Sequence, residues 1–272
     1  MKLTNKQIES FQNFIWQYYQ HNKREFAWRH IDDPYKVLVS EVMLQQTQTY
    51  RVAPKYELWL EEFGNFQTLA QAPLRDILSV WQGLGYNRRA KFLHQTAQTV
   101  VAQFNGQLPN DPEILVTLPG IGPNTAGSIC AFAFNTPTIF IETNIRAVYI
   151  HSFFKDADKV SDKEIYPILQ QTIDKNNARE WYYALMDYGV HLKQQFKNPS
   201  RKSKHHTQQS KFEGSHRQIR GAILRELDKN IQLNFETLVD YIKRDSESVE
   251  AAIQELINEG FIKNSNSMYC IV

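Results

Sequence analysis

Two glutamates are the residues of this 272-residue chain whose types and surroundings could do chemistry together. Glu41 lies inside the apolar run 37–44, where burial would raise its pKa and favour the protonated form that can donate a proton. Glu142 stands between the apolar run 139–141 and the amphipathic segment 145–148, an odd place for a purely structural carboxylate. Two carboxyl groups in different environments can combine proton donation with stabilisation of a developing positive charge.

A glycine turn is the second chemical feature. In LPGIGPNTAG at 118–127, Gly120 and Gly122 can take positive φ and let the backbone approach another surface. Pro123 suits the first turn of a helix, whose free N–H groups would point out of the turn. Such a helix end attracts an anion, so we expect the N–H groups of Gly120, Gly122 and Asn124 to bind a phosphate.

Helices must position these groups, because strand signals are almost absent from residues 1–195. Thr4 and Gln7 predict a capping box at the start of an amphipathic helix over 4–21. Apolar spacing and glycine punctuation predict further helices at 35–48, 51–63, 66–72, 73–83, 88–104, 161–176 and 178–193. The sequence therefore predicts an all-α body.

The rest of the chain predicts a linker and a small domain. Residues 196–214 are basic and polar, so Arg201, Lys202 and Lys204 belong either to a solvated connector or to a phosphate-contacting loop. Helical patterns at 217–228, 235–244 and 247–259, followed by two strands around an Asn-Ser turn, predict a winged helix over 215–272. Its third helix carries Glu247, Glu250, Glu255 and Glu259, which argues against major-groove reading by that helix.

Net charge, cysteine content and apolar runs exclude some classes of protein. The formal charge of +2 does not by itself indicate a nucleic-acid binder, so any basic surface must be local. The two cysteines, Cys130 and Cys270, lie far apart and are expected to be reduced; they cannot make a four-cysteine metal site. The N-terminus has no apolar signal core and no run is long enough to span a membrane. We expect a soluble, cytoplasmic protein.

Four stretches together resemble the helix-hairpin-helix DNA glycosylases, and most closely the MutY kind that removes mispaired adenine. They are LPGIGPNTAG at 118–127, SEVMLQQTQ at 40–48, WQGLGYNRRAKFL at 81–93 and ALMDYG at 184–189, and the resemblance covers about 10–195. It implies a mainly α, two-lobed HhH-GPD fold, with a six-helix lobe over 25–135 and a second lobe from 1–24 and 136–195. The winged-helix-like domain over 215–272 is additional.

The resemblance implies a role for each carboxyl group. Glu41 would donate a proton to adenine N7, whereas a surface or salt-bridged glutamate is the alternative. Glu142 stands where the family has an aspartate that stabilises the oxocarbenium-like sugar, and Asn144 matches a residue that holds this region and hydrogen-bonds the acid. The usual Asp-Gly-Asn is here Glu142-Thr143-Asn144. One extra methylene moves the carboxylate by about 1.5 Å, so either the pocket compensates or the substrate differs.

The resemblance also implies which residues would fill the gap left by a flipped base and which would bind that base. Gln46 matches the wedge residue, with Gln45 beside it, and Tyr86 matches the tyrosine that inserts next to the opposite base. A surface glutamine and a core tyrosine are the structural alternatives. The base pocket would be lined by Trp28, Arg29, Asn124 and Asp187, with Arg29 and Asp187 reading the Watson–Crick edge. Asn124 stands where bifunctional relatives carry a nucleophilic lysine, so no Schiff base is expected.

Two family features are missing, and three hypotheses stay open. The four-cysteine loop is replaced by the cysteine-free residues 193–213, so no iron–sulfur cluster is expected, although a monovalent cation could bridge the hairpin carbonyls. Residues 215–272 are too short for the family domain that reads 8-oxoguanine and have the winged-helix pattern, so we expect that domain to be missing. The first hypothesis is a monofunctional, monomeric, nucleoid-associated glycosylase acting on double-stranded DNA with adenine opposite guanine or 8-oxoguanine. The others are a thymine or uracil mismatch glycosylase and a non-catalytic DNA-binding protein.

Overall fold

The structure is a computed structural model that describes residues 1–196, 198–207 and 211–272. Its contacts divide the chain into two units, Met1–Glu41 with Pro109–Gln208 and Val42–Leu108 with Gln209–Val272. These units do not coincide with the predicted lobes. Residues 109–135 belong with the first unit, and the C-terminal domain groups with 42–108. Helix α2 (Pro34–Leu44) contains the boundary between the two units.

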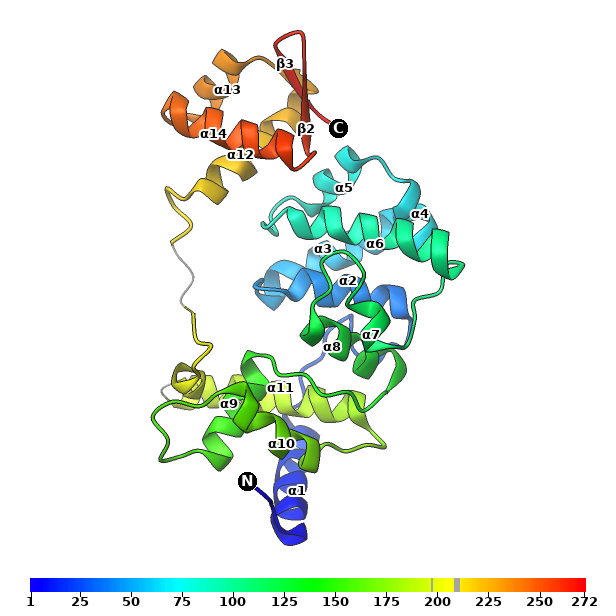
Figure 1. Ribbon diagram of the computed structural model, residues 1–272, viewed down its shortest axis with the longest axis vertical. Coiled ribbons are helices and arrows are strands. Elements are labelled where there is room, and N and C mark those ends of the chain that lie inside the picture. Colours follow the sequence, from blue (N-terminus) through cyan, green and yellow to red (C-terminus); the bar gives the residue numbers. More distant parts are fainter. Residues whose placement is uncertain (197, 208–210) are drawn as a thin grey trace. The chain divides into compact units, whose positions relative to one another are not determined.

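The first unit is helical within its described residues (Figure 1). Its elements are α1 (Asn5–Asn22), the beginning of α2, α7 (Pro112–Leu115), α8 (Pro123–Phe134), α9 (Thr143–Phe153), α10 (Asp162–Thr172), α11 (Ala178–Gln195) and the 3₁₀ helix η1 (Pro199–Lys202). The predicted capping box at Thr4 and Gln7 is present. Helices α7 and α9 were not predicted as such; α7 has only four residues, too few to show a period.

An aromatic core holds α1, α8, α9 and α11 together. The Trp181 and Tyr149 side chains are fully buried, and the Phe11 ring lies 5.6 Å from the Tyr149 ring and 6.0 Å from that of Trp181. The Phe132 ring of α8 stacks on that of Tyr183 in α11, with centroids 4.6 Å apart. Because each aromatic pair joins two helices, the core fixes how the elements that carry the candidate site lie together.

One glycine allows α11 to approach the first turn of α9. A Cβ added at Gly189 would lie 2.4 Å from the carbonyl oxygen of Asn144 and 2.7 Å from its Cβ. Any other residue would collide with backbone here, so the side chain of Asn144 reaches α11 only because position 189 is glycine.

Part of the predicted linker is packed against the first unit. The Val160 N–H donates to the carbonyl oxygen of Lys202, and the Lys204 N–H donates to that of Val160, both at 2.8 Å. Ser200 and Ser203 are buried. Residues 198–204 are therefore an ordered segment, while positions 197 and 208–210 of the predicted linker lie outside the described residues.

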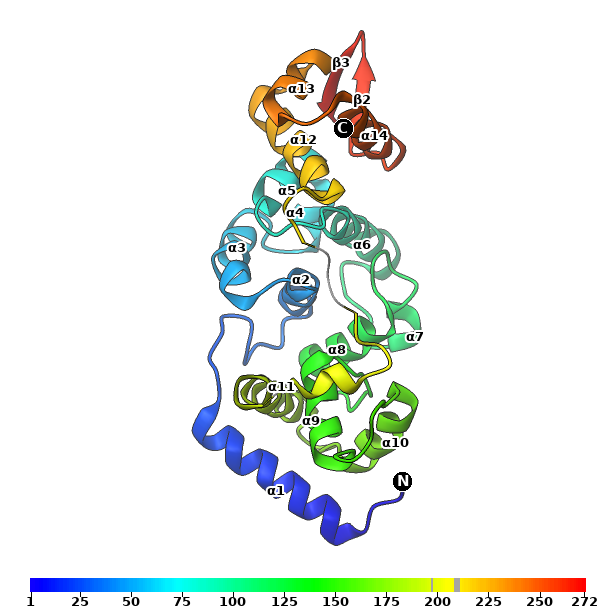
Figure 2. The same ribbon diagram turned by 90° about the vertical axis from the view of Figure 1, so that its left-hand side faces the viewer.

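The second unit contains a helical part and the C-terminal domain. The helical part has α3 (Thr49–Glu62), α4 (Phe66–Gln71), α5 (Leu74–Trp81) and α6 (Arg88–Phe104), with the rings of Trp59 and Trp81 edge to face at 5.5 Å. The C-terminal domain has α12 (His216–Asn230), β1 (Gln232–Leu233), α13 (Phe235–Ile242), α14 (Ser246–Asn258), β2 (Ile262–Ser265) and β3 (Met268–Ile271). Figures 1 and 2 both show α12 beside α5.

The predicted winged-helix arrangement is confirmed. The antiparallel sheet has the order β1-β3-β2, and β2 and β3 meet at the Ser265–Met268 pair. The two turn residues, Asn266 and Ser267, have φ of 51° and 61°, as a two-residue hairpin turn requires. Strand β1 was not predicted because two residues are too few to show alternation. Within the described residues, no helix is both long and apolar enough to cross a membrane.

Candidate active site

Glu41 is the candidate acid, and it lies on α2. Asp33 caps this helix, because its Oδ1 accepts from the N–H groups of Tyr35 and Lys36 at 2.9 and 3.2 Å. The pKa of Glu41 is raised to about 7, mainly by burial; a hydrogen bond with Ser128 lowers it and the nearby charge of Glu142 raises it. A carboxyl group with this pKa is about half protonated at neutral pH and largely protonated below it, as proton donation requires.

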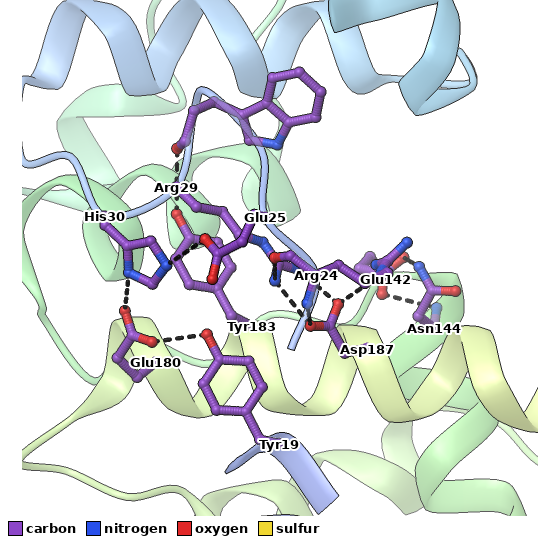
Figure 3. A network of polar contacts seen from close by, with 11 residues as sticks. Tyr19, Arg24, Glu25, Arg29, His30, Glu142, Asn144, Glu180, Tyr183 and Asp187 are labelled. Atoms are coloured by element: carbon purple, nitrogen blue, oxygen red, sulfur yellow. Dashed lines mark hydrogen bonds and ion pairs between the residues drawn. The ribbon is translucent and has the colours of Figure 1, made fainter. Parts of the chain in front are cut away.

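Glu142 caps the start of α9. Its Oε1 accepts from the backbone N–H groups of Asn144 and Ile145 at 2.8 and 2.9 Å, and its Oε2 accepts from the Asn144 side chain at 3.1 Å. Its side chain is therefore fixed at the helix N-terminus by three N–H donors. The two carboxyl groups lie near enough to interact electrostatically, and their surroundings differ (Figure 3 shows Glu142 and Asn144).

Lys193 completes a chain of polar contacts that the sequence did not reveal. Its ammonium group donates to Oδ1 of Asn144 at 2.6 Å, while the amide nitrogen of Asn144 donates to Glu142. Burial lowers the pKa of Lys193, and the charge of Glu142 raises it. Lys193 comes from α11, so it ties this helix to the carboxylate through Asn144. No motif marks it, because the contact depends on the close approach at Gly189.

Asn124 contacts the segment that precedes Glu142, and its place in the base pocket stays a prediction. It lies exposed in the first turn of α8, and its side-chain oxygen accepts from the N–H of Ile141 at 3.2 Å. Ile141 directly precedes Glu142 in the chain. The amide of Asn124 therefore holds the segment that leads into the candidate carboxylate.

Arg29 and Asp187 do not present free groups for reading a base edge. Asp187 is buried, and its two oxygens accept from both terminal nitrogens of Arg29 at 2.7 and 2.8 Å. Arg24 also donates to it, from Nε at 2.7 Å and from the backbone at 2.9 Å (Figure 3). The Arg29 guanidinium further lies 4.6 Å from the Tyr183 ring centroid. This ion pair argues against the predicted Watson–Crick reading and instead fixes the loop 24–29 on α11.

Trp28 is buried in the same loop. Its ring stacks on that of Phe26 with centroids 4.8 Å apart, and its carbonyl oxygen accepts from the Tyr183 hydroxyl at 3.5 Å. Burial raises the pKa of Tyr183, and the charge of Glu41 contributes. Tyr183 thus contacts the loop that carries Trp28 and is near enough to the predicted acid Glu41 to feel its charge, so the structure brings the predicted base-pocket tryptophan and the predicted acid into one region.

The glycine turn lies between α7 and α8, and α8 begins at Pro123 as predicted. Gly120 has φ of 74°, the Ile121 N–H donates to the Leu118 carbonyl at 3.2 Å, and Gly122 is the N-cap of α8 with Pro123 as its first residue. Gly120, Gly122 and Asn124 are exposed, and a Cβ at Gly122 would meet open space. Phosphate binding and a bridging cation at this turn stay predictions.

Two predicted DNA-contacting residues lie on strained loops of the second unit. Gln46 and Tyr86 are exposed, and both have positive φ, 55° and 50°. Left-handed backbone at non-glycine residues costs free energy and is frequent at functional sites. The loop of Tyr86 also contains Gly83 and Gly85 with φ of 92° and 75°.

A buried arginine clamps these two loops together. The guanidinium of Arg89 donates on one side to the carbonyl oxygens of Val42, Met43 and Gln45 at 2.7–2.9 Å. On the other side it donates to Gly85 at 2.9 Å and to Leu84 at 3.4 Å, and it also reaches the Thr47 hydroxyl at 3.1 Å. Burial lowers its pKa to about 10, so it stays charged at neutral pH. Arg89 was not predicted, although it stands in the motif that indicated Tyr86.

The other predicted DNA contacts are distributed along the chain. Gln45 is partly buried, and its carbonyl is held by Arg89. Arg201 and Lys204 are exposed on the ordered segment 198–204, and Lys202 donates to the carbonyl oxygen of Lys155 at 2.7 Å. These positions stay predictions.

The donor groups of the chain do not fit an iron–sulfur cluster. The two cysteines are Cys130, buried in α8, and Cys270 in β3, and four thiolates are needed. Among residues 1–196, 198–207 and 211–272, no three His, Cys, Asp or Glu side chains gather in a way that could hold a metal ion.

Comparisons with known proteins identify a family. Residues 39–175, which include Glu41, the glycine turn and Glu142, match the HhH-GPD superfamily of base excision DNA repair proteins. Adenine DNA glycosylases of Buchnera aphidicola subsp. Baizongia pistaciae and of Mycobacterium tuberculosis are both 35% identical, over 66% and 64% of this chain. Those matches cover 52% and 58% of the relatives, so the chain spans about half their length. A solved thermostable thymine-DNA glycosylase has the same fold, with a TM-score of 0.63 at 24% identity over 70% of this chain and 88% of that one.

Proposed function

The chain belongs to the HhH-GPD superfamily of base excision DNA repair proteins, and from this membership we propose that it is a monofunctional DNA glycosylase. Its substrate is double-stranded DNA with a mispaired base, most of all adenine opposite guanine or 8-oxoguanine, and it acts as a cytoplasmic monomer. The observation that carries the proposal is the pair Glu41 and Glu142, two neighbouring carboxyl groups of which the first is buried with a pKa raised to about 7 and the second is fixed by N–H donors at the start of α9.

Glu41 is the general acid in this proposal. The N-glycosidic bond breaks with its electron pair going to the base, and Glu41 donates a proton to N7 of the leaving adenine. A pKa of about 7 suits this step, because the acid is protonated at working pH yet gives up its proton readily. A water molecule then adds to C1′ of the sugar and loses a proton, which completes the hydrolysis.

Glu142 stabilises the positive charge that develops on the sugar as the bond breaks. Its side chain is longer than the aspartate expected at this position, but the carboxylate folds back onto the N–H groups of Asn144 and Ile145. This N-cap geometry takes up the extra methylene, which supports compensation within the pocket rather than a changed substrate. The names of the relatives, adenine DNA glycosylases, support the same choice.

The proposal excludes a lyase step at Asn124. An amide nitrogen cannot form a Schiff base with the sugar, and the oxygen of this side chain is used by the Ile141 N–H. The product is then an abasic site in an unbroken strand. The exposed turn at Gly120 and Gly122 would bind a DNA phosphate, and Gln46 and Tyr86 would enter the duplex when the base leaves it.

A panel of duplexes tests this function. Purified protein is incubated with duplexes that contain A:G, A:8-oxoG, T:G or U:G, and strands are scored after alkali. We expect cleavage of the adenine strand only after alkali and no adduct on borohydride treatment. Release of thymine or uracil instead of adenine would show that the protein is a thymine or uracil mismatch glycosylase. If no base is released from any duplex, the hypothesis of a non-catalytic DNA-binding protein is the one that remains.

Substitution of the acid makes this test specific. Glu41→Gln should slow base release by at least about 100-fold, because the amide cannot donate the proton, while DNA binding is kept. Exposed Glu9 of α1 serves as the matched control, since Glu9→Gln makes the same chemical change far from both carboxyl groups in the sequence. Unchanged base release by Glu41→Gln would show that another group supplies the proton.

A further inference from the structure

The C-terminal domain is joined to α6 by ion pairs around one glutamate. The Glu259 carboxylate accepts from Nε of Arg88 at 2.9 Å and from Arg220 at 2.6 Å. These partners hold the pKa of Glu259 down to about 2. Lys91 of α6 donates to the carbonyl oxygens of Glu259 and Gly260. A second set lies at the other end of α12, where Arg75 and Gln82 contact Asp228.

These contacts account for the acidic third helix of the winged-helix arrangement. Glu255 of α14 pairs with Arg220 at 2.8 Å and lies 3.0 Å from His216, and Glu259 at its C-cap binds α6. Carboxylates that are occupied in this way cannot repel DNA phosphates strongly. The charges of α14 therefore do not suit reading of the major groove. Instead, Glu255 and Glu259 bind α12 within the domain, and Glu259 also binds the domain to α6.

Docking brings the first turn of α12 to the loop 83–86. The Arg217 guanidinium donates to the Tyr86 hydroxyl at 3.0 Å and lies 5.7 Å from the Tyr86 ring centroid and 5.8 Å from that of Phe212. Tyr86 is 38% exposed and Phe212 58% exposed. The C-terminal domain thus contributes a cation and an aromatic ring to the surface around Tyr86.

The same loop is basic on its α3 side. Arg51 donates to the carbonyl oxygen of Gly83, and the end of the Lys55 side chain lies beside Gly83. Cations interleaved with exposed aromatic rings are the usual composition of a nucleic-acid surface, because the cations meet phosphates and the rings meet bases. Tyr86 lies among these groups, is partly exposed and has a strained backbone with φ of 50°.

We propose that the C-terminal domain extends the DNA-binding surface, with Arg217 binding a backbone phosphate of the duplex at the point where Tyr86 meets it. The domain is then a fixed extension that reads no bases, and Glu259 acts by holding Arg217 in place. This inference rests on the proposed function for its ligand, duplex DNA.

The first test is the salt dependence of DNA binding. Dissociation constants are measured for a mismatched duplex between about 50 and 200 mM salt, in the Glu41→Gln background, which prevents turnover. Arg217→Ala should raise Kd about tenfold at low salt and reduce the slope of log K against log salt by about one, as expected for one lost phosphate contact. Arg225→Ala, two turns further along α12, removes the same charge and should change neither. Equal effects of the two substitutions would overturn the proposal.

The second test measures whether removal of the negative charge of Glu259 strengthens or weakens DNA binding. Loss of an acid normally strengthens DNA binding, because a repulsion is removed. Glu259→Ala should instead weaken binding severalfold, and the double variant with Arg217→Ala should be no weaker than Arg217→Ala alone. Glu250→Ala, which removes an exposed acid of the same helix, should leave affinity unchanged or raise it slightly. Tighter binding by Glu259→Ala would contradict the docking role.

Base release by the wild-type protein separates this inference from the proposed function. If adenine is excised and Arg217→Ala binds DNA normally, the inference fails and the function stands. If no base is excised but Arg217→Ala weakens DNA binding as described, the surface stands and the catalytic proposal fails. A chain that binds no DNA at all would overturn both.

Discussion

A glutamate with a pKa of about 7 makes folding depend on pH. In the unfolded chain the same group has an ordinary pKa near 4.5, so the folded state binds more protons between these two values. The stability associated with the protonated form is fully present below about pH 4.5 and is lost as pH rises through about 7. Glu41 is therefore a source of instability in neutral solution, as is common for groups tuned to function.

This linkage predicts that Glu41→Gln stabilises the protein at neutral and higher pH. The amide cannot ionise, so the free energy of unfolding should exceed that of the wild type by about 2–3 kcal/mol at pH 8. The difference should shrink toward zero at about pH 4.5. Urea unfolding across this range measures it, with Glu9→Gln as the control. A difference that does not vary with pH would mean that Glu41 is not the group with the raised pKa.

Lys193 offers a second prediction at the scale of single residues. Lys193→Met keeps the length and volume of the side chain but removes the donor to Asn144. Because Asn144 then loses the group that orients its amide toward Glu142, single-turnover base release should fall about 10- to 100-fold. The Kd for DNA should stay within about twofold. Lys193→Arg should restore part of the rate, which a purely structural loss would not allow, and exposed Lys163→Met on α10 is the control.

At the scale of elements, the site depends on how closely α11 meets α9. The carboxylate of Glu142 is set by the first turn of α9, and Lys193 reaches Asn144 from α11. The two helices can approach this closely because Gly189 carries no side chain. Loop 24–29 is in turn tied to α11 through Asp187. One helix thus supports both the carboxylate and the loop that holds Trp28.

Gly189→Ala tests this arrangement. The added methyl group would lie 2.4 Å from backbone of Asn144, so the helices must separate, and we expect destabilisation of about 1–3 kcal/mol. Base release should fall as well. Gly221→Ala in α12 is the matched control, because a Cβ there meets nothing within 4 Å and alanine favours a helix by up to about 1 kcal/mol. Equal stability of the two variants would contradict the close approach.

At the scale of the whole molecule, the sequence predicted the kind of fold better than the division of the chain. The mainly helical HhH-GPD fold with a C-terminal winged-helix-like domain is confirmed, since capping at Thr4 and the apolar periods are local signals. Arg89 and Lys193 were not predicted, because their partners are distant in sequence and chosen by packing. Asp187 was given a role in base reading because its motif identifies the residue but not the two arginines that neutralise it.

Each unit consists of two chain segments, and the segments of the two units alternate along the sequence. The second unit therefore cannot be completed until its second segment has been synthesised. Residues 42–108 are translated before the C-terminal domain, and translation of residues 109–272 at 5–20 residues per second takes roughly 10–30 s. During that interval Arg75, Arg88 and Lys91 lack their partners in the C-terminal domain, because Asp228 and Glu259 have not yet been made. The C-terminal domain thus supplies the partners of these three basic side chains only after they have been synthesised.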